Sequence, residues 1–164
     1  RLFLHINKFI FVRNIPYLCG MLNYIIDMMM GSGLRLNTRV DDLDRATLRE
    51  VVKYATQYCT DTFGTRKKKV PFSVSITKQR SGEPAYGQYC PYDNKLFIYH
   101  NNCPTVKLVI QTVIHEYTHY MQPVKSKYSK LMDIYGYDKH PMEHSSNLVA
   151  VILKKKCRKD LFSN

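Results

Sequence analysis

The sequence predicts an α+β fold in which a small, antiparallel-edged sheet packs on helices. Apolar residues recur every three or four positions over residues 41–64 and 104–122, which is the period of an amphipathic helix. Between them, residues 70–78 alternate polar and apolar side chains, as a half-buried strand does. Residues 85–90 and 95–100 flank a Pro-Tyr-Asp-Asn sequence whose chemistry suits a hairpin turn. We therefore expect a sheet of at least three strands.

Two helices are expected before the sheet. Residues 15–30 carry apolar side chains at a helical period that stops at Gly31, which predicts a buried helix. In the second helix, Asp41 or Asp42 is expected to cap the N-terminus and Gly64 to end the C-terminus.

Three helices are expected after the hairpin. Pro104 suits the first turn of a helix that continues to about Gln122 and is stopped by Pro123. Two further helices are expected over residues 126–135 and 141–159.

Length and composition predict one globular unit. The chain has 164 residues, of which 45% are hydrophobic and 23% charged, and this excludes the disordered and collagen-like classes. Without an internal repeat or a long linker, we expect an N-terminal apolar extension and helix over residues 1–40 and one compact domain over residues 41–164. Polar residues interrupt the apolar stretch over residues 2–30, so we do not expect it to span a membrane. We also do not expect a signal peptide, because the apolar segment is irregular and no small-residue cleavage site stands out.

Charge and cysteine content bear on partners and compartment. Lys and Arg total 25 against 13 Asp and Glu, and the resulting net charge of +12 attracts phosphate backbones, anionic membranes and acidic proteins. Two basic clusters, residues 66–69 and 154–159, are candidates for nonspecific nucleic-acid contact. Five scattered cysteines without a C-x-x-C pair predict free thiols, and so an intracellular reducing compartment or the interior of a virion or other assembly.

The predicted helix over residues 104–122 contains the sequence His115-Glu116-Tyr117-Thr118-His119, an H-E-x-x-H motif. Four residues at about 100° each return His119 to within ~40° of His115, so both imidazoles face one point and can bind one Zn²⁺. Glu116 then reaches the water from the side as a general base. The apolar remainder of this helix leaves the motif on a polar strip with Gln111 and Gln122.

A catalytic zinc site has three protein ligands and one open position, so a third ligand is expected downstream. The candidates are Asp133, Asp138, His140, Glu143 and His144. We favour Glu143, because Pro141 places it near the N-terminus of the last helix, where the partial positive charge favours a carboxylate. Asn147, one turn later on the same face, is expected to hydrogen-bond a metal ligand.

These residues resemble the zincin metallopeptidases, and within them the gluzincins, in which a Glu on a following helix completes the His pair. Glu143-His144-Ser145-Ser146-Asn147 is similar to the thermolysin-type spacing, although Asn147 stands where an Asp is usual. The resemblance covers residues 41–159. It implies a minimal zincin-like core that binds Zn²⁺ and hydrolyses peptide bonds of a polypeptide substrate. It implies the metal ligands His115, His119 and Glu143 and the general base Glu116.

The resemblance also implies where a substrate lies. In zincins the strand before the active helix is an edge strand, so an extended peptide is expected to pair with the main chain of Leu96, Phe97, Ile98 and Tyr99. Tyr135 and Tyr137, together with Tyr128, lie between the two ligand segments. Each is a candidate to hydrogen-bond the oxyanion of the reaction.

A second interpretation of the sequence belongs to a different functional class. The net charge and the basic clusters also suit a structural or nucleic-acid-associated protein, part of a larger viral or cellular assembly, that keeps a zincin fold. Metal content discriminates between the two interpretations, because only the peptidase requires bound zinc.

Overall fold

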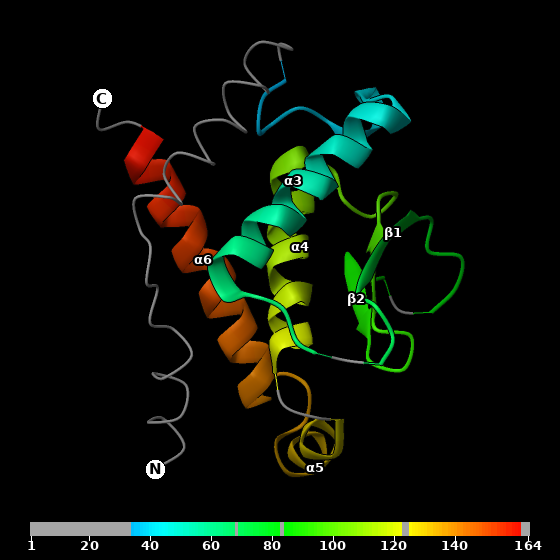
Figure 1. The fold of residues 1–164 in the computed structure, drawn as a ribbon, viewed down its shortest axis with the longest axis vertical. Coiled ribbons are helices and arrows are strands. Elements are labelled where there is room, and N and C mark those ends of the chain that lie inside the picture. Colours follow the sequence, from blue (N-terminus) through cyan, green and yellow to red (C-terminus); the bar gives the residue numbers. More distant parts are fainter. Residues whose placement is uncertain (1–33, 68, 83, 123–124, 162–164) are drawn as a thin grey trace.

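The computed structural model describes residues 34–67, 69–82, 84–122 and 125–161, with the side chains of residues 125–127 and 152–161 left out. Within these ranges the chain forms four α-helices and a three-stranded mixed sheet, which confirms the predicted α+β class. Figure 1 shows the sheet on one side of helix α4 (Val106–Met121) and helix α6 (Pro141–Leu161) on the other. The helix expected over residues 15–30 lies outside the described residues.

Helix α3 (Arg45–Phe63) begins later than expected. Asp44 caps it, because the Asp44 carboxylate accepts two main-chain N–H groups of the first turn at 2.8 Å each. The expected caps, Asp41 and Asp42, lie instead in a 3-10 turn at Val40–Asp42. The helix ends at Gly64 as predicted, where a φ of 76° favours glycine.

The sheet has the strand order β1-β3-β2, with β1 at Ser73–Thr77, β2 at Gly87–Cys90 and β3 at Lys95–Tyr99. Strand β2 pairs antiparallel with β3 as the predicted hairpin, and β1 pairs parallel with β3. The central strand β3 is therefore paired along both edges. The expectation that Leu96, Phe97, Ile98 and Tyr99 offer a main-chain edge to a substrate is wrong, because β1 and β2 occupy both sides.

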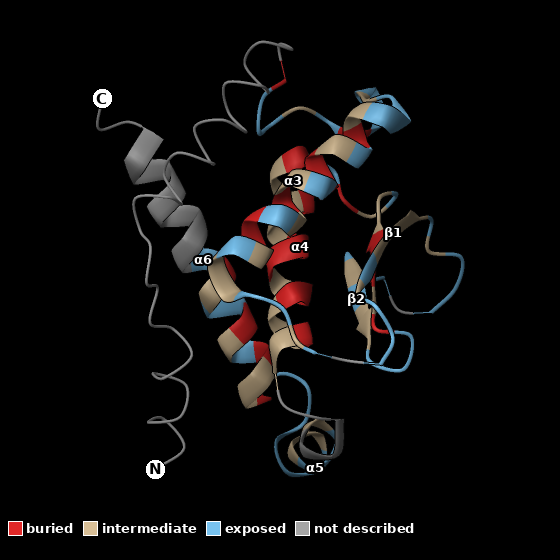
Figure 2. Ribbon diagram, in the orientation of Figure 1, coloured by how far each residue is buried: buried red, intermediate tan, exposed pale blue. Residues whose placement is uncertain are grey.

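Helix α4 lies at the centre of the core. Its residues Val106, Val109, Val113 and Tyr117 have no exposed surface, and Figure 2 shows buried residues concentrated along this helix. Helix α3, helix α6 and strands β2 and β3 all contact it. Because each fully buried aliphatic side chain stabilises the fold by about 1.5–3 kcal/mol, this packing fixes the position of α4 and of any site that it carries.

The remaining helix boundaries are close to those expected. Thr105 caps α4 through a hydrogen bond from the Leu108 N–H to its hydroxyl, so Pro104 precedes the cap and does not lie in the first turn. Helix α5 spans Lys125–Tyr135, and α6 begins at Pro141 as predicted. Each expected helix after the hairpin is therefore present.

The segment before α3 packs into the same core. Leu34 and Val40 are 6% and 5% exposed, and Arg39 forms an isolated β-bridge with Thr105 at the start of α4. Residues 34–40 therefore pack against the unit that residues 41–164 were expected to form. The role of residues 1–33 stays a prediction, since they lie outside the described residues.

Two further expectations can be compared with the described residues. No helix in the described ranges is both long and apolar enough to cross a membrane. Cys59, Cys90 and Cys103 are free thiols, as predicted, and burial raises the pKa of Cys103 to about 11.

Gly87 allows β2 to approach α4 closely. A Cβ atom at this position would lie 2.6 Å from Thr112 Cγ2 and 2.8 Å from the Phe97 carbonyl oxygen. We expect Gly87→Ala to lower the free energy of unfolding by about 1–3 kcal/mol, because the added methyl overpacks this contact. Urea unfolding measures the loss. Combining Gly87→Ala with Thr112→Ser, which removes the opposing methyl, should recover part of it, and an alanine variant as stable as the wild type would contradict the close approach.

Candidate metal centre

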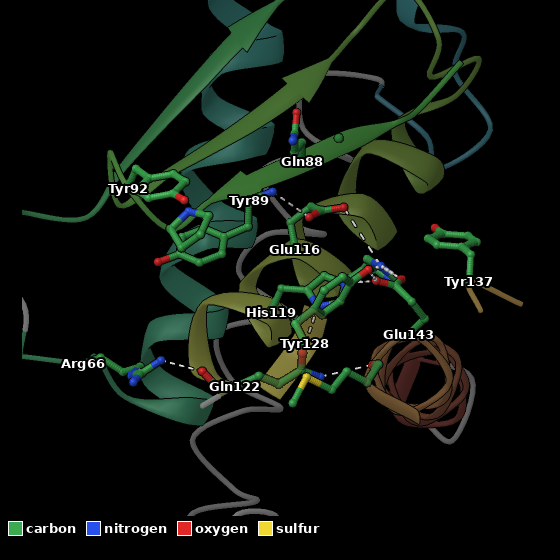
Figure 3. Close-up of a pocket in the computed structure, with 14 residues that line it drawn as sticks. Arg66, Gln88, Tyr89, Tyr92, Glu116, His119, Gln122, Tyr128, Tyr137 and Glu143 are labelled. Carbon is green, nitrogen blue, oxygen red and sulfur yellow. Dashed lines mark hydrogen bonds and ion pairs between the residues drawn. The ribbon is translucent and has the colours of Figure 1, made fainter. Parts of the chain in front are cut away.

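Three side chains converge between α4 and α6. His115 and His119 lie one turn apart on α4, with their Nε2 atoms 3.0 Å from each other. Glu143, in the first turn of α6, places Oε2 3.3 Å from His115 Nε2 and Oε1 3.3 Å from His119 Nε2. Figure 3 shows the Glu143 carboxylate pointing at the imidazoles of α4. The structure thus brings together the three residues expected as metal ligands.

The separations between these atoms fit a tetrahedral metal ion. Bonds from Zn²⁺ to nitrogen or oxygen are about 2.0–2.1 Å long, so two ligand atoms of a tetrahedral ion lie about 3.3 Å apart. Here the three separations are 3.0, 3.3 and 3.3 Å. Two imidazoles and one carboxylate are also a donor set that first-row divalent metals accept. In the described ranges this is the one His, Cys, Asp and Glu cluster that can hold a metal ion.

The proton positions also favour a cation among the three atoms. Gln122 donates its amide N–H to the Met142 carbonyl oxygen at 3.1 Å, which turns its amide oxygen toward His119. That oxygen lies 2.8 Å from His119 Nδ1, so Nδ1 carries the ring proton and Nε2 of the neutral ring presents a lone pair. The 3.3 Å separation between His119 Nε2 and Glu143 Oε1 therefore requires either a proton on Nε2 or a metal ion between the two atoms.

Gln122 connects the two helices that carry the ligands. Its amide nitrogen lies 3.1 Å from the Met142 carbonyl oxygen, 3.2 Å from Ser145 Oγ and 3.1 Å from Ser146 Oγ, all in the first turns of α6. Through its amide oxygen the same side chain orients His119. Asn147, expected in this role, is exposed and makes no hydrogen bond to a ligand within the described part of the chain. The His119 to Gln122 spacing of three residues on one helix face is the sequence signal for this contact.

Glu116 lies beside the three converging atoms and not among them. Its Oε2 accepts a hydrogen bond from the Tyr89 main-chain N–H at 2.8 Å, and its Oε1 lies 4.0 Å from His115 Nε2. Burial raises the pKa of the Glu116 carboxyl, although the two imidazoles and the Tyr89 N–H oppose that rise. The residue expected to act as general base is thus positioned at the rim of the cluster by strand β2.

Glu143 has the opposite electrostatic environment. Burial works against its charge, but hydrogen bonds with His115, His119 and Tyr128 outweigh burial and hold the pKa of the carboxyl well below its usual range. Tyr128 donates its hydroxyl to Glu143 Oε1 at 2.7 Å. Burial and the adjacent Glu143 raise the pKa of Tyr128, so its phenol keeps the donated proton. Glu143 is therefore ionised at neutral pH, as a metal ligand must be.

The other candidates for the third ligand lie elsewhere. His140 is fully buried, and its Nδ1 accepts the Met142 main-chain N–H at 3.2 Å, which caps the start of α6. Its Nε2 lies 3.0 Å from the Tyr128 carbonyl oxygen, and its ring lies against that of Tyr128 with centroids 4.1 Å apart and an angle of 30° between the planes. Asp133, Asp138 and His144 are exposed. His140 therefore positions Tyr128 and the helix that carries Glu143.

A cleft of about 640 Å³ opens onto these groups (Figure 3). Tyr128 and Tyr137 line it, whereas Tyr135 is 49% exposed and lies outside its walls. None of the β3 residues lines the cleft. The wall on the sheet side comes instead from Gly87, Gln88 and Tyr89 of β2.

Replacing Glu143 with Gln tests the third ligand. A neutral amide oxygen is a much poorer zinc ligand than a carboxylate, so we expect zinc affinity to fall by about 10-fold or more. Competition with a chromogenic chelator measures the affinity. His144→Ala, a change at the exposed neighbouring position, should leave it unaltered. If His144→Ala released the metal and Glu143→Gln did not, the assignment of Glu143 would be wrong.

Gln122→Met tests the bridge between the helices. Methionine has a similar length but cannot hydrogen-bond His119 or α6, so zinc affinity should fall by about 10- to 100-fold, as for other partners of metal ligands. Gln111→Met makes the same chemical change on α4 away from the ligands, and we expect no loss there. Equal zinc affinities of the two variants in the same chelator assay would show that Gln122 does not orient the site.

No protein-family model matches this chain, and neither a curated protein nor a solved structure shows significant similarity to it. Its function therefore has to be inferred from the site itself. What the described residues establish is an α+β protein with two histidines and a glutamate, His115, His119 and Glu143, that can hold a metal ion.

Proposed function

We propose that the protein is a zinc-dependent peptidase. The observation that carries this proposal is the position of Glu116, a buried carboxylate held beside a three-ligand cluster at the wall of an open cleft. A structural zinc site is closed by four protein ligands, whereas this cluster has three and borders a cleft. His115, His119 and Glu143 would hold the ion, which when bound supplies Lewis-acid chemistry that activates water and polarises a carbonyl.

Glu116 is proposed as the general base. Its Oε2 is occupied by the Tyr89 N–H, which leaves Oε1 on the side of His115 to receive the proton. A carboxyl whose pKa is raised by burial is a better proton acceptor than an exposed one. Glu116 Oε1 takes a proton from the attacking water and afterwards gives it to the leaving amine.

Strand β2 is proposed to hold the substrate in place of β3. In an antiparallel pair, alternate residues direct their N–H and C=O groups to the outer edge. Tyr89 directs its N–H outward to Glu116, so Gly87, two residues earlier, presents its own N–H and C=O on that edge. An extended polypeptide paired there lies alongside Glu116 and the metal ligands.

Tyr137 is the tyrosine that we propose for the oxyanion. It lines the cleft from the loop between α5 and α6, while the hydroxyl of Tyr128 is already donated to Glu143. A phenol beside the reacting carbonyl stabilises the charge that develops on its oxygen. Tyr135, outside the cleft, does not meet this requirement.

The Glu116→Gln variant tests the proposed function. It should retain the fold and zinc but lose about 10²- to 10⁴-fold in kcat/KM on a mixed peptide library, because the base is removed and the ligands are not. Glu50→Gln, the same change at a half-exposed position on α3, is the matched control and should retain full activity.

Two outcomes would overturn the proposal. Equal turnover by the wild type and Glu116→Gln would show that the activity arises at another centre or from a contaminant. Absence of turnover in both proteins with zinc fully bound would favour the basic structural or nucleic-acid-associated protein. Elemental analysis of the purified chain, with and without added zinc, accompanies both measurements.

A further inference from the structure

One cation in the cleft is not explained by the metal site. Arg66 lines the cleft from the loop between α3 and β1, and Figure 3 shows it at the opposite end of the labelled residues from Glu143. Apart from the two histidines of the site, it is the one basic residue among those that line the cleft. In the ranges that the structure describes, no carboxylate forms an ion pair with it.

The conformation of Arg66 is fixed by the end of α4. Its main-chain N–H donates to Tyr120 Oη at 2.6 Å, and its Nη1 donates to the Tyr120 and Gln122 carbonyl oxygens at 3.1 and 2.5 Å. These carbonyls belong to the last turn of the helix, so Arg66 also caps the C-terminus of α4. The guanidinium is therefore held in place before any ligand arrives.

Capping the helix uses one guanidinium nitrogen. The N–H groups on Nε and Nη2 have no acceptor among the described residues, and together they form the planar edge that binds a carboxylate through two parallel hydrogen bonds. Half-burial in a cleft strengthens such a pair, because solvent screens it less than at an exposed surface.

The walls near Arg66 are aromatic. Tyr89 and Tyr92 line the cleft between the β2 edge and this end, with Pro91 between them in the sequence. Burial raises the pKa of Tyr89 to about 12, even though the charge of Arg66 opposes the rise, so its phenol stays neutral. Tyr89 therefore supplies no negative charge to Arg66.

We propose that Arg66 binds a carboxylate of the substrate, so that the cleft selects peptides carrying an acidic side chain or a free C-terminal carboxylate at the end remote from Glu143. This inference rests on the proposed peptidase function and adds the substrate class to it. Both carboxylate sources present the same two oxygens to the guanidinium, and the test below separates them.

The test measures binding and does not depend on turnover. The probes are two pairs of fluorescent hexapeptide pools built from uncharged residues. In the first pair both ends are blocked, and a Glu in one pool or a Gln in the other is placed at each position in turn. In the second pair the C-terminus is a free carboxylate in one pool and an amide in the other. Polarisation titrations use the zinc-loaded, full-length Glu116→Gln protein, which is not expected to consume the probe. We expect one carboxylate pool to bind about 10-fold or more tightly than its neutral partner, and which pool does so identifies the source.

Adding Arg66→Gln to the Glu116→Gln protein should reduce this preference to less than about twofold, because the guanidinium that makes two parallel hydrogen bonds is lost. Arg66→Lys keeps the positive charge but cannot make the two parallel hydrogen bonds, so it should give an intermediate preference. This variant serves as the test if the Arg66→Gln protein does not fold. Arg80→Gln, at an exposed position outside the cleft, is the matched control and should retain the preference. The preference is a ratio within one protein, so a general loss of affinity does not imitate it.

Equal binding of carboxylate and neutral pools, or a preference that survives both Arg66 variants, would overturn the inference and leave Arg66 as a helix cap only. A carboxylate preference that depends on Arg66 in a protein whose wild type cleaves no peptide would overturn the peptidase proposal and leave the carboxylate site standing. Cleavage by the wild type without a carboxylate preference would support the peptidase proposal and overturn the carboxylate site.

Discussion

The structure depends on helix α4 being packed on several sides at once. Its apolar face is buried against α3 and β3, and its polar strip is enclosed by β2 and α6. A helix packed in this way cannot rotate without exposing valines or burying imidazoles without partners. The directions of His115, Glu116 and His119 are consequently set by the hydrophobic core, and the neighbouring elements have only to bring Glu143 and the Tyr89 N–H to fixed positions.

The two carboxylates beside the histidines differ because their partners differ. Glu143 faces a phenol that donates to it and two imidazoles that donate when protonated, and these partners lower its pKa in spite of burial. Glu116 receives one direct hydrogen bond, from the Tyr89 N–H, and burial prevails, so its pKa is raised. Such a separation is the arrangement expected when one carboxyl stays charged as a ligand and the other exchanges a proton. Strand β2 supplies the hydrogen-bond partner of Glu116, and helix α6 places Glu143 beside the imidazoles.

Local chemistry allowed much of this structure to be predicted from the sequence. Hydrophobic period located α3 and α4, and turn composition located the hairpin. The spacing of His115 and His119 and the helix position of Glu143 were enough to predict their convergence. The prediction that failed depended on a contact between distant segments. Strand β1 pairs in parallel with β3, which no local pattern shows, so β3 is the central strand and β1 and β2 are the edges. Asn147 fits a helical wheel as well as Gln122 does, and only the crossing of α4 and α6 decides between them.

Gln122 also links the two ends of the cleft. Its side chain holds His119 and the first turns of α6, and its carbonyl oxygen accepts a hydrogen bond from Arg66. The guanidinium proposed to bind substrate is thus hydrogen-bonded to the residue that orients His119. Because Arg66 is also hydrogen-bonded to the hydroxyl and the carbonyl oxygen of Tyr120, the proposed carboxylate would meet a guanidinium that does not need to rearrange. Under the proposed function, a guanidinium held in this way would set the distance from the bound carboxylate to Glu116, and so the length of chain between the charged group and the scissile bond.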